Sequence, residues 1–173
     1  MAKAKEIELS ASGSYGEAAA AVVSVRGAEV MEHADGVLDT GDIERVHDMR
    51  VATRRLRAAL EVFEPCFPRK PHRQVLKQVK RLADGLGERR DRDVAIDALA
   101  GFNRQMPAAD RKGVSSLIAT MRAEQEQANR DLAPLVDSAK LAALRESLEE
   151  LVASARGRDA GPHAADGEGG DGA

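Results

Sequence analysis

The sequence is poor in aromatic residues: its 173 residues include no Trp, one Tyr and three Phe. It also offers few of the aromatic and β-branched runs from which strands are built, whereas the helix formers Ala, Leu, Arg and Glu recur throughout. Hydrophobic residues make up 43% of the chain, which is enough for a core that must be largely aliphatic. These features predict an all-α domain.

A single cysteine, Cys66, leaves no partner for an intramolecular disulfide, which argues against the disulfide scaffold of small secreted proteins. We interpret Cys66 as a small apolar packing residue. No stretch approaches the roughly 20 apolar residues of a membrane-spanning helix, and the amino terminus lacks the apolar run of a signal peptide. We therefore expect a soluble, cytoplasmic protein.

The chain as a whole has no excess of positive charge, since 26 Lys and Arg against 29 Asp and Glu give a net charge of −3. The segment 44–92, however, contains 14 basic and 7 acidic residues and therefore carries +7, which leaves −10 for the remainder. A basic middle thus lies between acidic flanks. This distribution favours a polyanionic partner for the middle of the chain.

Glycines and prolines divide the chain into helical segments. Residues 1–13 lack periodicity, and residues 157–173 are acidic, Gly-rich and without large apolar side chains, so we expect a flexible amino terminus and a disordered tail. Between them, residues 14–156 are expected to form one helical domain of five to six helices. The expected helices are 14–38, 42–64, 71–86, 91–105, 108–133 and 138–156.

The expected helix 42–64 carries two stripes when residues advance by 100°. The apolar stripe is typical of a core-facing helix and consists of Met49, Ala52, Leu56, Ala59, Leu60 and Phe63. A second stripe, here called the basic ridge, spreads over about 15 Å and consists of His47, Arg50, Arg54 and Arg57. Ordinary solvated faces interleave acids with bases, but no carboxylate occurs between residues 50 and 57. Like charges at these spacings repel one another, and a bound anion would relieve that repulsion. The alternative is that the basic ridge is an ordinary solvated face.

The next expected helix, 71–86, repeats this division. Val75, Val79, Leu82 and Leu86 form its apolar stripe, which leaves a basic side with Arg73, Lys77, Lys80 and Arg81. Two adjacent helices of this kind could form the walls of one basic groove.

Two motifs resemble the CHAD family, the conserved-histidine α-helical domain. Residues 42–63, DIERVHDMRVATRRLRAALEVF, resemble the family's signature helix, and residues 76–94, LKQVKRLADGLGERRDRDV, are similar to its second element. The motifs occur in the family's order and separation, and the resemblance extends over about residues 14–156. It implies an antiparallel helical bundle with a basic central surface that binds inorganic polyphosphate.

The resemblance also implies a set of polyphosphate-binding residues. By motif position these are His47, Arg50, Arg54, Arg57, Lys77, Lys80, Arg81, Arg89 and Arg90. Arg55 projects about 100° away from Arg54 and is less certain to belong to the set, and Arg92 stands where the family usually has an apolar residue. His47 keeps two interpretations: it contacts a phosphate oxygen, or it is a structural histidine that ties helix ends together.

Other titratable residues favour structural roles. Asp91 and Asp93 fit the capping of a helix that starts after Gly87, or pairing with the neighbouring arginines, better than they fit metal ligation. His33, His72 and His163 lack the spacing of ligands and are expected on the surface or in the tail. The sequence contains no Gly-rich phosphate loop, no carboxylate pair with a base and no nucleophile elbow. We expect binding without catalysis, cofactor or metal.

Two other functions stay open. A basic helical surface also suits a nucleic-acid backbone, although stacking aromatics are missing and acidic flanks would repel a long duplex. The chain could also be an accessory subunit of a polyphosphate-processing enzyme. Members of the family commonly contain two helical halves and this chain resembles the first alone, so we expect a homodimer that completes the missing half. We expect it in the cytoplasm, with polyphosphate granules as a further location.

Overall fold

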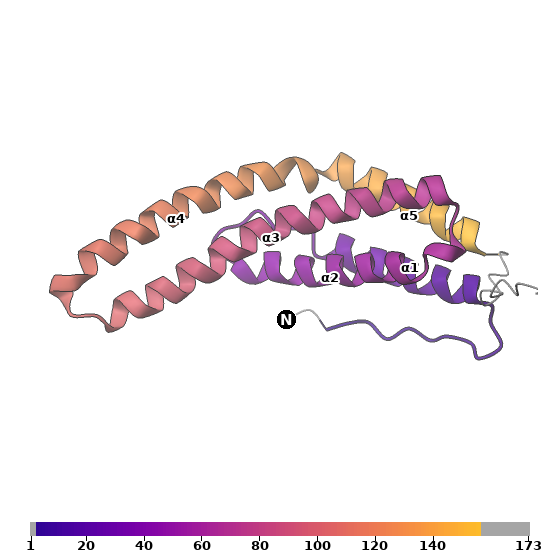
Figure 1. The fold of residues 1–173 in the computed structure, drawn as a ribbon, viewed down its shortest axis with the longest axis horizontal. Coiled ribbons are helices and arrows are strands. Elements are labelled where there is room, and N and C mark those ends of the chain that lie inside the picture. Colours follow the sequence, from indigo (N-terminus) through magenta and orange to yellow (C-terminus); the bar gives the residue numbers. More distant parts are fainter. Residues whose placement is uncertain (1–2, 157–173) are drawn as a thin grey trace, which may run out of the picture.

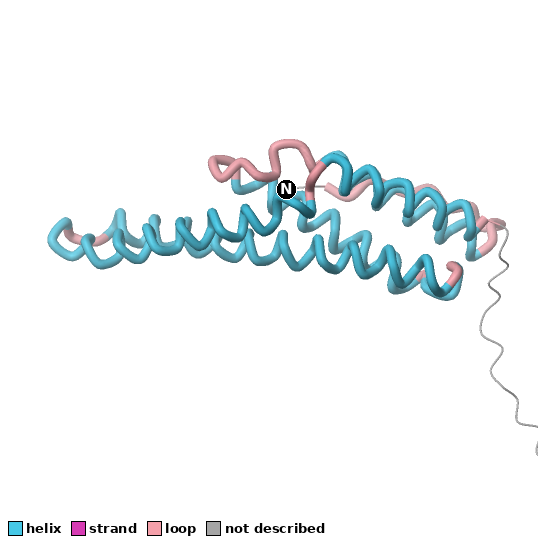
Figure 2. Tube along the Cα trace, turned by 90° about the horizontal axis from the view of Figure 1, so that it is seen from above, coloured by secondary structure: helices cyan, strands magenta, loops and turns pink. Residues whose placement is uncertain are grey.

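Five α-helices make up most of the computed structural model, which describes residues 3–156. In chain order they are α1 (Tyr15–Glu32), α2 (Ile43–Val62), α3 (Arg69–Gln105), α4 (Arg111–Leu132) and α5 (Ser138–Ala155). Figure 2 shows helices joined by loops and no strand in this range, so the predicted all-α class is confirmed. None of the described helices combines the length and the apolar character needed to cross a membrane.

The helices form a bundle with a projecting hairpin. Figure 1 shows α3 and α4 as a long antiparallel pair, with α1, α2 and α5 alongside only the amino-terminal half of α3. α2 packs between α1 and α3, and α5 packs against α1 and α3, which closes a four-helix bundle. α4 packs mainly on α3. We call residues 94–124, the part of the hairpin beyond the bundle, the arm.

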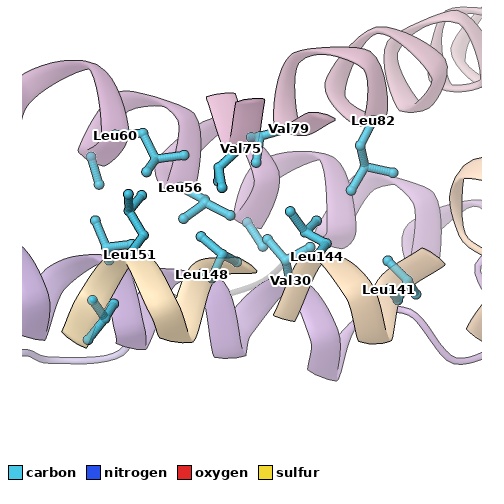
Figure 3. Packing of buried hydrophobic residues seen from close by; sticks show 14 of the residues in the cluster. Val30, Leu56, Leu60, Val75, Val79, Leu82, Leu141, Leu144, Leu148 and Leu151 are labelled. Atoms are coloured by element: carbon cyan, nitrogen blue, oxygen red, sulfur yellow. The ribbon is translucent and has the colours of Figure 1, made fainter. Parts of the chain in front are cut away.

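Aliphatic side chains from four helices fill the bundle, as Figure 3 shows. Leu56 and Leu60 of α2 face Leu148 and Leu151 of α5, while Val75 of α3 packs beside them. In α2 every residue of the predicted apolar stripe is buried except Phe63, which is half-buried at the helix end. The predicted orientation of α2 is therefore confirmed.

Side-chain caps explain where three of the helices begin. Ser14 accepts a hydrogen bond from the Glu17 amide at 3.1 Å, and Glu17 accepts one from the Ser14 amide at 2.7 Å, which is a capping box for α1. Asp42 caps α2, and Asp137 caps α5 after the interruption at Pro134. α1 ends at Glu32 and does not reach the expected residue 38; the left-handed conformation of Gly36, where φ is +66°, is incompatible with a helix through that position.

The expected break between residues 86 and 91 does not occur, because α3 runs without interruption for 37 residues. Gly85 lies against α4 and the turn after it: a β-carbon at this position would come within 3.0 Å of Leu135 Cδ1. At Gly87, a β-carbon would lie 3.9 Å from Arg50 Nε. At Gly85, tight packing outweighs the roughly 1 kcal/mol that a glycine costs inside a helix. The capping interpretation of Asp91 and Asp93 is therefore wrong, since no helix begins there, whereas the other interpretation, pairing with a neighbouring arginine, is confirmed for Asp93 by its ion pair with Arg89.

The segment before α1 contains no helix, but Lys5 contacts α1. Its backbone amide donates to Glu29 Oε1 at 2.6 Å, and its ammonium group pairs with Glu32. Arg26 completes this contact by donating to the Lys5 carbonyl and to Glu29. The expected disordered tail, residues 157–173, lies outside the described residues.

Candidate functional site

The basic ridge occupies one side of α2. Arg54 is exposed, and His47, Arg50 and Arg57 are partly exposed. Arg50 lies beside Gly87 of α3, since a β-carbon at Gly87 would be in ordinary van der Waals contact with Arg50 Nε at 3.9 Å. The ridge therefore lies next to α3, as the predicted pair of adjacent basic helices requires.

An open concavity of about 660 Å³ lies along the first turns of α3. Six of its eight lining residues are cationic; the eight are Arg69, Lys70, Arg73, Gln74, Leu76, Lys77, Lys80 and Arg81. Three of them, Lys77, Lys80 and Arg81, belong to the predicted site. Arg69 and Lys70 were missed because the helix was expected to start at Pro71, although proline is well tolerated in the first turn of a helix.

Glu61 connects the ridge to the concavity. Its Oε1 atom accepts a hydrogen bond from Arg57 Nε at 3.1 Å and lies 3.1 Å from Lys80 Nζ. Hydrogen bonds from Arg57 and Lys80 hold the pKa of Glu61 below its ordinary value of 4.5. Glu61 lies just beyond residues 50–57, the part of α2 without a carboxylate, and was therefore missed, although the i,i+4 spacing from Arg57 could have indicated it.

Arg89 does not lie on this surface. Its side chain is completely buried and forms an ion pair with Asp93 at 3.1 Å. Burial lowers the pKa of Arg89 and raises that of Asp93, whose carboxylate also accepts a hydrogen bond from Gln125 of α4 at 2.6 Å. Its inclusion among the polyphosphate-binding residues is corrected here, because a buried guanidinium group cannot reach a ligand on the surface.

Arg90 is partly buried and holds the start of α2 against α3. Its Nη1 atom donates to the Ile43 carbonyl at 3.0 Å, and its Nη2 atom lies 3.5 Å from Glu44. Glu44, His47 and Asp48 each place one ligand atom within 4.8 Å of the others, so they could hold a cation geometrically. The charge of Arg90 beside Glu44 opposes a cation there.

His72 is a structural histidine rather than the surface residue that the sequence predicted. It is 1% exposed, its Nε2 atom lies 2.8 Å from the Leu60 carbonyl, and its ring stacks on Phe67. It thereby ties the start of α3 to the end of α2. His33 is partly exposed after α1, whereas His163 lies outside the described residues. Cys66 is buried in the core, as expected for a packing residue.

Comparison with known proteins agrees with the motifs. The family model described as CHAD domain matches residues 22–169, a range that contains α2, α3 and the concavity. No curated protein matches the chain. Since the family model covers most of the 173 residues, the chain belongs to the CHAD domain family.

Proposed function

We propose that the protein binds inorganic polyphosphate without catalysing a reaction on it. The binding surface, here called the basic surface, combines three arginines of α2, one exposed and two partly exposed, with the cations of the α3 concavity. Its residues are Arg50, Arg54, Arg57, Arg69, Lys70, Arg73, Lys77, Lys80 and Arg81. The observation that carries the proposal is the concavity with six cations, adjoining the basic ridge through Glu61. His47 lies at one end of this surface and keeps its two interpretations.

The chemistry of these side chains suits a flexible polyanion. Arginine offers planar, permanently charged donors for nonbridging phosphate oxygens, and lysine adds compact charges. Residues 69–81 of α3 extend over about 18 Å, similar to the about 15 Å of the ridge, so several phosphate groups of one chain could be held at once. Release of counterions from the chain would add to the affinity and make it dependent on salt.

The basic surface offers positive charge to a nucleic-acid backbone but no aromatic ring on which bases could stack. Tyr15 packs on Phe63, with ring centroids 5.1 Å apart, and Phe67 stacks on His72. The remaining aromatic residue, Phe102, lies on the arm. Single-stranded nucleic acids gain much of their affinity from stacking on aromatic rings, so we expect the protein to prefer polyphosphate.

The test is a titration of the full chain with polyphosphates of several lengths, single-stranded DNA and inorganic phosphate, each at two salt concentrations. We expect affinity to rise with polyphosphate length and to exceed that for DNA of equal charge at both salt concentrations. Equal affinity for DNA and polyphosphate of the same charge would indicate general polyanion attraction instead.

We also propose that a second copy of the chain packs on the arm. Val94, Phe102 and Leu117 are 50%, 56% and 48% exposed there, whereas Ile118 is buried. Two helices can bury only the seam between them. A second hairpin, related by a twofold axis, would bury the flanking apolar side chains in a four-helix arrangement.

A further inference from the structure

We propose that Glu61 is a built-in competitor that occupies a phosphate subsite between Arg57 of α2 and Lys80 of α3. The inference rests on the proposed function and specifies how its binding surface is filled before polyphosphate arrives. Glu61 would limit access to the two cations, and it would favour a phosphate chain over a single phosphate ion.

The geometry of the three side chains carries the proposal. One oxygen atom, Glu61 Oε1, lies 3.1 Å from both Arg57 Nε and Lys80 Nζ, so a single anionic oxygen is shared between two helices. A nonbridging phosphate oxygen has the same charge and accepts from the same donors at similar distances. The carboxylate therefore marks a position that a phosphate group can take.

The subsite is open to exchange. The side chains of Arg57, Glu61 and Lys80 are 42%, 43% and 42% exposed, so a ligand can approach them from solvent. Ion pairs with this exposure contribute little to stability, because water and salt screen them. Glu61 is also the penultimate residue of α2, so its side chain can turn outward without disturbing a helix interior.

Tethering explains why the competitor discriminates between ligands. Glu61 is attached to the same helix as Arg57 and is therefore present at a high effective concentration, against which a free phosphate ion competes poorly. A polyphosphate chain already held by Lys77 or Arg81 in the concavity presents its next phosphate at a comparably high effective concentration. We therefore expect a polyphosphate chain to displace Glu61 more efficiently than a free phosphate ion does.

The test compares Glu61→Gln with Glu64→Gln in the full chain. Glu64 is exposed in the turn after α2 and forms no ion pair within the described residues. Glu64→Gln makes the same change in net charge as Glu61→Gln without removing a carboxylate from the two cations. We expect Glu61→Gln to tighten the binding of inorganic phosphate by about tenfold and the binding of long polyphosphate by less. The ratio of the affinity for polyphosphate to that for inorganic phosphate should therefore fall. Glu64→Gln should change both affinities by less than about twofold.

A third variant assigns the effect to the subsite. Adding Lys80→Met to Glu61→Gln removes one of the two cations and should abolish most of the gain, with circular dichroism checking that each variant remains folded. Equal effects of Glu61→Gln and Glu64→Gln, or a gain that survives Lys80→Met, would overturn the inference while leaving polyphosphate binding intact. A wild-type protein that binds polyphosphate no more tightly than DNA of equal charge would instead refute the proposed function.

Discussion

Arg89 and Asp93, one turn apart on α3, form an ion pair in which both side chains are completely buried. Gln125 of α4 donates to the same carboxylate, so the pair also connects the two helices of the hairpin. The group lies at the base of the arm, and the adjacent Arg90 donates to the carbonyl of Ile43 at the start of α2. Burial disfavours both charges. The hydrogen bond from Gln125 and the charges of Arg89 and Arg90 oppose this effect at Asp93, and the charges of Asp93 and Asp39 oppose it at Arg89.

Replacing Asp93 with Asn should strongly destabilise the protein. The substitution leaves the Arg89 guanidinium group buried without its counter-charge, a change that typically costs about 3–5 kcal/mol. Asp91→Asn provides the control, because Asp91 is exposed and its substitution should stay within about 0.5 kcal/mol. Urea unfolding of the two variants measures the difference. Similar free energies of unfolding for both would show that the buried pair is not needed for stability.

The same pair shows how far the sequence could predict this structure. The orientation of α2 was predicted correctly, because its apolar and basic residues repeat with the helical period. This pattern lies within a single helix and can be recognised without knowledge of the neighbouring helices. In α3 the spacing from Val75 to Leu86 continues at Arg89 and Asp93, which are both buried. The expected break at Gly85 and Gly87 hid that continuation. Only the packing around α3 reveals that Gly85 permits the close approach of Leu135 and that neither glycine ends a helix.

His72 and Glu61 illustrate the same limit for the candidate site. The carbonyl of Leu60 that contacts His72 is 12 residues away in the sequence, and Lys80 lies 19 residues after Glu61. Neither pair follows a helical period, because each joins α2 to α3. The sequence could identify a basic stripe on each helix and, from the i,i+4 spacing, the pair of Arg57 with Glu61, but not the contact of Glu61 with Lys80 of the other helix.

Acid should weaken the fold through Glu29. Burial acts to raise the pKa of Glu29, but hydrogen bonds from the Lys5 amide and Arg26, with the charges of Arg26 and Arg55, outweigh it and hold that pKa below its ordinary value of 4.5. A carboxyl whose pKa is depressed in the folded state binds fewer protons there than in the unfolded chain, so stability falls as pH falls from about 4.5 through the folded-state pKa. Glu29→Gln should flatten this part of the stability curve.

Urea unfolding between about pH 3 and pH 6 measures that curve. Glu17→Gln would be a poor control, since Glu17 belongs to the capping box, whereas Glu149→Gln changes an exposed carboxylate of α5. An identical acid slope for wild type and Glu29→Gln would contradict the assignment. Retention of the wild-type slope in Glu149→Gln would support it.

Reversing the charge of Arg54 should weaken polyphosphate binding by about tenfold or more, because Arg54 is exposed at the centre of the basic ridge. The helical content and cooperative unfolding should stay nearly unchanged, since the residue lies outside the core. Arg122→Glu, on the exposed side of the arm, makes the same change in net charge and should have a much smaller effect. Equal losses for the two variants would place the polyphosphate elsewhere or show a purely long-range effect of charge.

The exposed side chains of the arm lead to a prediction about assembly. If a second copy covers them, the protein should be a dimer at micromolar concentration, and replacing both Phe102 and Leu117 with Ser should shift it to monomer. Val62→Ser is the matched control, because Val62 is an apolar residue with 63% exposure at the end of α2, away from the arm. Light scattering over a concentration series, with and without polyphosphate, follows the mass directly.

A wild-type protein that remains monomeric under every condition, and binds polyphosphate as a 1:1 complex, would rule out the dimer and leave each chain with one open basic surface.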